Sequence, residues 1–536
     1  MIDKINASYP EIFLFAVTCL VMLFGLSRQL PIRRLCAPIA GVGLFGAAVI
    51  ALATTVDGSA TQYLAHLPKY GKVLAAVVGL LLLMVMTGVP DRQYESTVAR
   101  GATFDPLRAT RGEFYSFFLF SITGLMLCAG ADDLILLFLA LELTSLPTYV
   151  MVTISTNRNR SMEAGVKYFF LGALGAAMFL YGFAMLYGAT GSTNLDVIHK
   201  ALVQQVATGG LNGIAVAGVL LSVLGICFKI AAVPMHFYTP DVYQGAASPV
   251  SAFLAFVPKA AGFFALMLIV GAVGWGVGNH YGPLPDPLYS VLAIIAVLTM
   301  TVGNVLALLQ RSVKRILAYS SIAHSGYMLV GLITGPGKDG NFSSSGLGAI
   351  LFYLLTYGVM NLGAFAVIGC LERENADGST DEADDIADIR GLCRTRPTLG
   401  WTMVLSSVGL LGLPPLLGFW AKLPLFTSGI AAGEVVLVVI LGINSAIAAY
   451  YYLGLAKAAL LESPDPAAQA SIRPSALTAR VAAAIFSAIG IVVLAGYPLT
   501  QLAGHGAEYR KSAVAPATRP AQQQAANAEA PAAVQP

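Results

Sequence analysis

The chain has 536 residues, of which 57% are hydrophobic and only 11% are charged. In soluble globular proteins about a quarter of the residues carry a charge, so this composition excludes that class. The formal net charge of +3 is too small to indicate a nucleic-acid partner, and we expect none.

Apolar stretches that could each cross a bilayer follow one another along most of the chain. A membrane-spanning helix needs about 20 apolar residues, and on that basis we predict an all-α polytopic membrane protein with about fourteen transmembrane helices. The first stretch lacks a basic leader and a convincing cleavage site, so we expect a retained helix rather than a signal peptide. The predicted spans are 11–28, 36–56, 72–89, 114–130, 132–153, 163–189, 212–233, 241–273, 288–309, 315–334, 346–371, 399–430, 434–461 and 477–500.

Two of these regions contain prolines that a straight helix tolerates poorly. Proline removes a backbone donor and clashes with the preceding turn. Each region also has a lysine close to its prolines, and paired broken helices in two halves of a chain indicate a transport site between repeats. We therefore predict a broken helix in each half. The prolines are Pro234, Pro240, Pro249 and Pro258 in region 212–273, and Pro414 and Pro415 in region 399–430.

Lysine and arginine gather in alternate loops. The loops after the odd-numbered spans carry most of them, whereas the intervening loops carry little more than Lys69, Lys72, Lys200 and Lys338. By the positive-inside rule the basic loops are cytoplasmic. An even number of spans then places both termini in the periplasm, and we expect a multi-pass protein of the bacterial inner (plasma) membrane.

Two segments are predicted to lie outside the membrane. Residues 372–396 contain an acidic run from Asp381 to Asp385 and should form a cytoplasmic loop. The tail 507–536 is rich in alanine, proline and glutamine, a composition that favours disorder. No β-strand is expected in the chain.

Ionisable side chains lie inside several spans, where a charge costs about 2.5–3.5 kcal/mol on insertion scales. Glu142 lies near the middle of the fifth span, and Lys229, Lys259 and Lys422 lie beside the proline-containing segments. Desolvation lowers the pKa of a lysine and raises that of a carboxyl group, so both can exchange protons near neutral pH. We predict that these four residues transfer protons, and that Glu142 pairs with Lys229 between the fifth and seventh spans.

Each of these residues also has a structural interpretation. Glu142 could be half of a structural ion pair, and a lysine beside a helix break could simply stabilise the helix end. Lys259 could simply pair with a carbonyl group. Three secondary candidates are more evenly balanced. Lys167 lies about one turn into the sixth span and could extend to the interface, and His236 and His324 could be packing residues.

The sequence shows no pattern for redox or metal chemistry. Its cysteines form no C-x-x-C pair and have no histidine at metal-ligand spacing. There is no phosphate-binding glycine motif and no histidine pair with obvious haem spacing. We therefore expect no cofactor and no metal in this chain. The cysteines are Cys19, Cys36, Cys128, Cys227, Cys370 and Cys393.

Two long motifs contain most of the candidate residues. Residues 228–260 read FKIAAVPMHFYTPDVYQGAASPVSAFLAFVPKA, and residues 310–327 read QRSVKRILAYSSIAHSGY. Both closely resemble signatures of the antiporter-like subunits of respiratory complex I. Shorter segments at 357–366 and 388–392 resemble the N-type subunit in particular. The resemblance covers nearly the whole chain to about residue 500.

The resemblance implies a fold with two inverted five-helix repeats and a broken helix in each. It implies three N-terminal helices in 1–113, a first repeat of helices 4–8 in 114–273 and a second repeat of helices 9–13 in 274–461. A C-terminal helix then follows in 462–506, before the tail in 507–536. The residues that match the proton-transfer residues of the family are Glu142, Lys229, Lys259 and Lys422, with His236 and His324 on the connecting path.

The resemblance also implies a function. Subunits of this type translocate protons in NADH:quinone oxidoreductase, which couples electron transfer from NADH to quinone to proton pumping. NADH, FMN, iron–sulfur clusters and quinone would then be bound by other subunits. The expected partners are other complex I membrane subunits, especially the M-type and K-type neighbours and the lateral helix of the L-type subunit, and the lipid bilayer.

Two other functions stay open on the sequence. The chain could be a subunit of a multi-subunit cation/proton antiporter, which shares the same ancestry, although the N-type motifs argue against it. It could instead be a scaffold that conducts nothing, although a scaffold gains nothing from buried glutamate and lysine. Identifying the proteins that purify with the chain would separate these functions.

Overall fold

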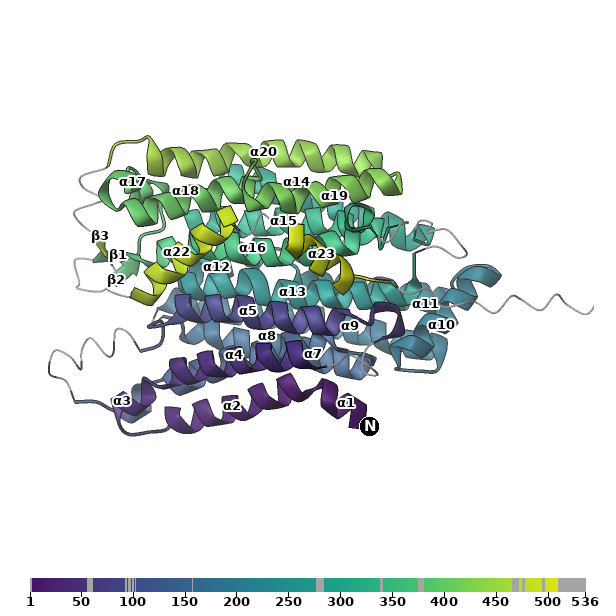
Figure 1. The fold of residues 1–536 in the computed structure, drawn as a ribbon, viewed down its shortest axis with the longest axis horizontal. Coiled ribbons are helices and arrows are strands. Elements are labelled where there is room, and N and C mark those ends of the chain that lie inside the picture. The colour runs from purple at the N-terminus through teal and green to yellow at the C-terminus, as the bar shows by residue number, and fades with distance from the viewer. Residues whose placement is uncertain are drawn as a thin grey trace, which may run out of the picture.

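Helices that lie side by side make up nearly all of the structure (Figure 1). In this computed structural model the described residues are 2–54, 61–91, 94, 98, 101, 103–156, 158–275, 284–337, 341–374, 380–464, 472–474, 478–493 and 497–509. Figure 1 shows α2 at one edge of the bundle and α20 at the other, with α13 and α16 between them. The helices of the first half are α1 Ile2–Ala7, α2 Tyr9–Gly25, α3 Leu30–Arg33, α4 Cys36–Ala53, α5 Leu67–Met86, α7 Arg111–Ala129, α8 Leu134–Ile154, α9 Asn159–Thr190, α10 Leu195–Thr208, α11 Gly213–Lys229, α12 Thr239–Gly245 and α13 Ser248–Val273.

The second half continues the same arrangement. Its helices are α14 Asp286–Leu308, α15 Val313–Thr334, α16 Gly346–Gly369, α17 Leu392–Thr395, α18 Pro397–Leu411, α19 Leu417–Ala432, α20 Val435–Leu460, α22 Thr478–Val493 and α23 Tyr497–Gly506. Short 3₁₀ turns lie at η1 Gln62–Leu64, η2 Pro106–Arg108, η3 Phe342–Ser344 and η4 Ile386–Ile389.

The length and composition of these helices agree with a membrane-spanning bundle. Within the described residues, ten helices are long and apolar enough to cross a membrane, and four shorter apolar helices accompany them. The predicted class, an all-α polytopic membrane protein, is confirmed, while the total of about fourteen spans stays a prediction. Figure 1 shows α1 and α10 at one end of the bundle, and α3, α17 and the strands at the opposite end.

Both predicted helix breaks are present. Irregular backbone at 230–238 separates α11 from α12, and irregular backbone at 412–416 separates α18 from α19. Two of the prolines behave differently from the prediction. Pro249 lies in the first turn of α13, where a backbone donor is not needed, and Pro258 lies inside α13 without ending it. Every residue of α13 is buried. Packing against neighbouring helices therefore keeps α13 continuous where Pro258 removes a backbone hydrogen bond.

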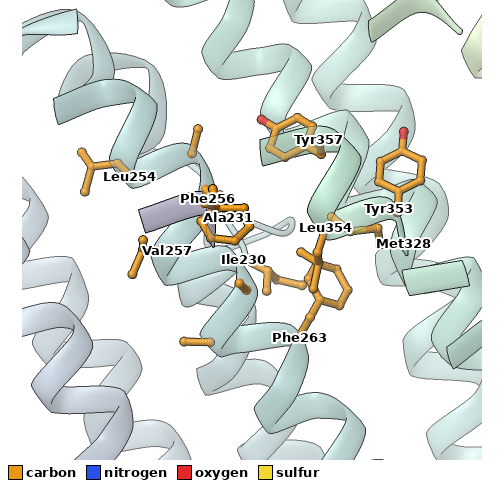
Figure 2. Packing of buried hydrophobic residues seen from close by; sticks show 14 of the residues in the cluster. Ile230, Ala231, Leu254, Phe256, Val257, Phe263, Met328, Tyr353, Leu354 and Tyr357 are labelled. Carbon is orange, nitrogen blue, oxygen red and sulfur yellow. The ribbon is translucent and has the colours of Figure 1, made fainter. Parts of the chain in front are cut away.

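Two central helices, α13 and α16, form the middle of the core. Figure 2 shows Phe256 and Phe263 of α13 packed near Leu354 of α16 and Ile230 of the first helix break. Both helices are buried along nearly their whole length. Polar groups on them are therefore shielded from lipid and have to find partners inside the protein.

The expectation of no strand was wrong. A small antiparallel sheet has the strand order β2-β1-β3, with β1 at Leu371–Glu374, β2 at Thr380–Glu382 and β3 at Ile472–Pro474. Glu372 pairs with Glu382, and Leu371 pairs with Pro474. These strands are short, charged and outside the apolar helices, so no alternating apolar pattern marks them in the sequence.

The sheet brings one carboxylate of the acidic run into the protein. Glu382 accepts hydrogen bonds from the backbone N–H of Ser248 at 2.8 Å and from its Oγ at 2.6 Å, and pairs with Lys314 Nζ at 2.9 Å. Burial alone would raise the pKa of the Glu382 carboxyl, but Lys314 and Ser248 hold this pKa below its ordinary value. The carboxylate thereby connects the loop to the first turns of α13 and α15.

Three further predictions about loops need correction. Lys72 lies inside α5, 6% exposed, where its Nζ pairs with Glu11 of α2 at 2.8 Å. Residues 195–208 form the helix α10, capped by Asn194, rather than a loop. Within the tail predicted from 507, Ala507 and Tyr509 are buried, and residues 510–536 lie outside the described residues.

Candidate proton-transfer site

Glu142 and Lys229 form an ion pair inside the bundle. Lys229 is the last residue of α11, and its Nζ lies 3.0 Å from Oε1 of Glu142 in α8. The ammonium also donates to the Ser145 hydroxyl and lies 5.5 Å from the centre of the Phe179 ring. The Lys229 side chain is 1% exposed and that of Glu142 is 18% exposed. The predicted contact between the fifth and seventh spans is confirmed.

A close contact between α9 and α11 positions this pair. A Cβ atom on Gly225 of α11 would lie 2.4 Å from the backbone N of Phe179. Glycine is therefore needed there, because it lets the two helix backbones approach each other. This approach places the Phe179 ring of α9 beside the Lys229 ammonium at the end of α11.

Lys259 lies at the centre of α13, where uncharged groups contact its ammonium. It is 1% exposed, and its Nζ donates to Ser321 Oγ at 2.6 Å and to the carbonyl oxygen of the same residue. The ring centre of Tyr357 in α16 lies 4.9 Å from the ammonium. No ion pair between Lys259 and a carboxylate is found among the described residues, and its contacts are to uncharged groups. A hydroxyl, a carbonyl and an aromatic face therefore take the place of a counter-ion.

Lys422 has a similar environment beside the second helix break. It lies in α19, 4% exposed, and its Nζ donates to the Leu411 carbonyl at 2.7 Å and to Ser445 Oγ at 3.0 Å. Leu411 is the last residue of α18, so the ammonium lies at the carbonyl end of that helix, where the helix dipole favours a cation. The centre of the Tyr327 ring is 5.2 Å from the ammonium.

His324 lies between the surroundings of these two lysines. It lies on α15 and is 1% exposed. Its ring centre is 5.0 Å from that of Tyr357, which faces Lys259, and 5.5 Å from that of Tyr327, which faces Lys422. Its Nδ1 lies 2.6 Å from the Tyr353 hydroxyl, and its Nε2 lies 2.8 Å from the Tyr452 hydroxyl. One aromatic ring therefore lies between His324 and Lys259, and another lies between His324 and Lys422.

The other two secondary candidates lie apart from this group. His236 is 5% exposed in the first helix break, and its Nδ1 has no hydrogen-bond partner within the described residues. Lys167 has 44% of its side chain exposed on α9, where its Nζ pairs with Glu163 at 2.7 Å and Asp241 at 3.1 Å. The structure thus provides no contact that joins either residue to the buried lysines, and their roles stay predictions.

Sequence reasoning missed the uncharged partners of the buried cations. Serine and tyrosine are common inside spans, so their presence alone does not single them out. A weak signal exists on α15 and α16, because Ser321 is three residues before His324, and Tyr353 is four residues before Tyr357. Such spacings place side chains on one helix face. The partners of the buried lysines are Ser145, Ser321, Tyr357 and Ser445. The partners of His324 are Tyr353 and Tyr452.

Comparisons with known proteins identify the family. Residues 131–448 match the family described as NADH:quinone oxidoreductase/Mrp antiporter, TM. The NADH-quinone oxidoreductase subunit N of Nitrosomonas europaea is 35% identical over 477 residues, which cover 88% of this chain and 92% of that protein. The chain belongs to the subunit N family of NADH-quinone oxidoreductases.

Solved structures support the same family assignment. A chain of respiratory complex I from Thermus thermophilus is 32% identical, with a TM-score of 0.72, and the match covers 92% of this chain and 99% of that one. A chain of the Mrp complex from Dietzia sp. has a TM-score of 0.73 at 20% identity, covering 95% of this chain and 97% of that one. The second likeness shows a shared fold only. The described residues contain no group of three potential metal ligands.

The contact between Glu142 and Lys229 predicts coupled effects of substitution. Removing one partner of a buried pair leaves the other charge unpaired, at about 3–5 kcal/mol. Glu142→Gln should therefore disfavour the charged form of Lys229 and reduce proton translocation, and Lys229→Ala should abolish the same step. We expect the double variant to be no worse than Lys229→Ala alone.

The measurement is proton translocation in membrane vesicles for the two single variants and the double variant. Glu462→Gln is a suitable control, because Glu462 pairs with Arg390 at 2.9 Å where both side chains are partly exposed, and translocation should be unchanged. Strictly additive losses in the double variant would show that Glu142 and Lys229 act independently.

Proposed function

We propose that this chain translocates protons across a membrane as the N-type subunit of an NADH:quinone oxidoreductase, using Glu142, Lys229, Lys259 and Lys422. One observation carries the proposal. Three lysines are each at most 4% exposed, and two of them have no carboxylate partner among the described residues. Such a lysine is costly to keep charged, so it readily gives up its proton.

The ligands of each lysine support proton exchange over a purely structural role. Hydroxyls and carbonyls stabilise an ammonium, and they leave no unpaired buried charge when the lysine becomes neutral, as a carboxylate would. The pair of Glu142 and Lys229 differs, because its carboxylate stabilises the charged lysine directly. When the pair separates, the Lys229 proton is released. A positive charge on one of Lys259, His324 and Lys422 disfavours a second charge nearby, because single aromatic rings separate these groups.

Both helix breaks contribute to this exchange. Lys229 ends α11, and Lys422 lies beside the end of α18, so each break holds an ammonium near free backbone carbonyls. Irregular backbone inside a membrane is tolerated where it lines a water-containing cavity. We infer that water enters at the breaks and carries protons to and from the lysines. Lys167, His236 and His324 are proposed as secondary members of the path.

The wider assembly is proposed on the same basis. The domain limits at 113, 273, 461 and 506 define two inverted repeats between terminal helices. The other membrane subunits of the complex are the partners, especially the M-type and K-type neighbours and the L-type lateral helix, and other subunits hold NADH, FMN, iron–sulfur clusters and quinone.

An exposed stripe on α8 supports a neighbour at Glu142, since Leu139 and Leu146 on the same face are 56% and 51% exposed. Cross-linking mass spectrometry of the purified complex tests these contacts.

A cation/proton antiporter subunit remains the second candidate, favoured by the fold shared with the Mrp complex. The two functions differ in their driving force. Proton movement that follows NADH oxidation and stops when quinone reduction is inhibited supports the oxidoreductase. Proton movement that is driven by a sodium gradient in the same vesicles would favour the antiporter.

Lys422 offers a direct test of the proposed function. Lys422→Met removes the ammonium but keeps an unbranched side chain of similar length. We expect proton translocation per NADH oxidised to fall severely in the assembled complex, because no proton can be held beside the second helix break. Lys457→Met is the matched control, since the Lys457 side chain is 65% exposed on α20. Unchanged translocation by the Lys422→Met complex would show that Lys422 is structural.

The proposed orientation can be tested independently of pumping. The basic loops predict that the sheet end of the bundle faces the cytoplasm and that both termini face the periplasm of an inner-membrane protein. Reporter proteins fused after Ser379 and after Pro536 should therefore report opposite sides of the membrane. Two reporters on the same side would exclude this topology.

A further inference from the structure

The histidine between Lys259 and Lys422 has a hydroxyl on each side. His324 of α15 has its Nδ1 2.6 Å from the hydroxyl of Tyr353 in α16, and its Nε2 2.8 Å from the hydroxyl of Tyr452 in α20. All three side chains are at most 1% exposed. Three separate helices thus converge to occupy both nitrogens of one imidazole with groups that can each donate or accept a proton.

Polar contacts extend from this group towards Lys422. The Tyr452 hydroxyl also hydrogen-bonds Ser320 Oγ, and its ring packs 4.5 Å from that of Tyr451. Tyr451 donates to Asn304 Oδ1 at 2.9 Å, and Asn304 donates to the Tyr327 hydroxyl at 2.9 Å. The Tyr327 ring is the one that faces the Lys422 ammonium at 5.2 Å.

The opposite side of His324 leads towards Lys259. Its ring centre lies 5.0 Å from that of Tyr357, which is one turn along α16 from Tyr353. The Tyr357 ring in turn lies 4.9 Å from the Lys259 ammonium. The group of His324, Tyr353 and Tyr452 therefore lies between the surroundings of the two lysines.

We propose that Tyr353, His324 and Tyr452 form a proton relay, in which both tyrosine hydroxyls exchange protons directly with the histidine. This inference rests on the proposed function and identifies how a proton crosses the segment between Lys259 and Lys422. Tyr353 and Tyr452 are proton-transfer residues in this account, rather than packing partners of a buried histidine.

The chemistry follows from the two nitrogens of imidazole. In neutral His324 one nitrogen carries a proton and donates to one tyrosine, while the other accepts from the second tyrosine. A proton passed to the accepting nitrogen by its tyrosine gives an imidazolium, which releases the proton on its other nitrogen to the opposite hydroxyl. The donating hydroxyl is reprotonated by a water molecule, and the accepting hydroxyl passes its own proton to a second water molecule, so no net charge is left behind.

This sequence leaves the histidine in its other tautomer. Before a second proton can follow in the same direction, both hydroxyls have to rotate and the histidine has to regain its first tautomer. The relay therefore passes one proton at a time. A water column also has to reorient after each proton, but its molecules turn freely, whereas the relay groups are held by three helices. The relay therefore provides a step at which transfer can be controlled.

Conservative variants in the assembled oxidoreductase complex test the relay. Tyr452→Phe and Tyr353→Phe each remove one hydroxyl and keep the aromatic ring. We expect each to lower proton translocation per NADH to the level of His324→Ala. The Tyr452→Phe/His324→Ala double variant should show no further loss, because the three residues act as one unit. Tyr63→Phe is the matched control, since Tyr63 is 1% exposed and its hydroxyl donates to the Leu268 carbonyl at 2.9 Å.

A ring-fluorinated tyrosine at position 452 provides a second measurement that does not depend on assembly of the phenylalanine variants. It keeps the hydroxyl and the packing but makes the phenol more acidic. The relay predicts a changed translocation rate and a shifted pH profile, whereas a structural hydroxyl predicts neither. Unchanged translocation in both phenylalanine variants, or an unchanged profile with the fluorinated residue, overturns the relay. If Lys422→Met abolishes pumping while these variants pump normally, the relay fails and the proposed function stands.

Discussion

The cost of holding an ammonium ion away from water is the constraint on which the rest of the structure depends. A charge in the interior of a membrane protein is stable only where the protein replaces the lost solvation. Lys259 and Lys422 receive that solvation from a hydroxyl, a carbonyl and an aromatic face, without a carboxylate among the described residues. Because this replacement is partial, the neutral form of each lysine is more favourable than it would be in water, which supports the proposed proton exchange.

The fold supplies this solvation through its helix breaks and its buried central helices. A continuous helix satisfies its own carbonyls, so it has few to offer to a side chain. The break after α18 frees the Leu411 carbonyl for Lys422, and α13 and α16 surround Lys259 with protein on every side. In the first half, Glu142 provides a full countercharge to Lys229 instead. Lys229 therefore differs from Lys259 of the same half, which has only uncharged partners among the described residues, as Lys422 has in the second half.

The membrane class, the two helix breaks and the contact between Glu142 and Lys229 could all be predicted from the sequence. These follow from long apolar runs, prolines and charges that stand out within such runs. The pairing of Lys72 with Glu11 could not be predicted, because a lysine at the edge of an apolar run fits a loop equally well and its partner is distant in the sequence. The inward position of Glu382 depends on strand pairing that no sequence pattern marked. The hydroxyl partners depend on which face of each helix packs inward.

The central claim is that the buried lysines exchange protons rather than serve as fixed cations. Lys259 tests it most directly, because its ammonium lacks a carboxylate partner and lies in an unbroken, fully buried helix. Lys259→Arg keeps a positive charge but replaces the ammonium with a guanidinium that does not readily release its proton. The decisive measurement is proton translocation per NADH oxidised by the assembled Lys259→Arg complex in vesicles. The account predicts a severe loss of translocation, and translocation equal to that of the unsubstituted complex would contradict it.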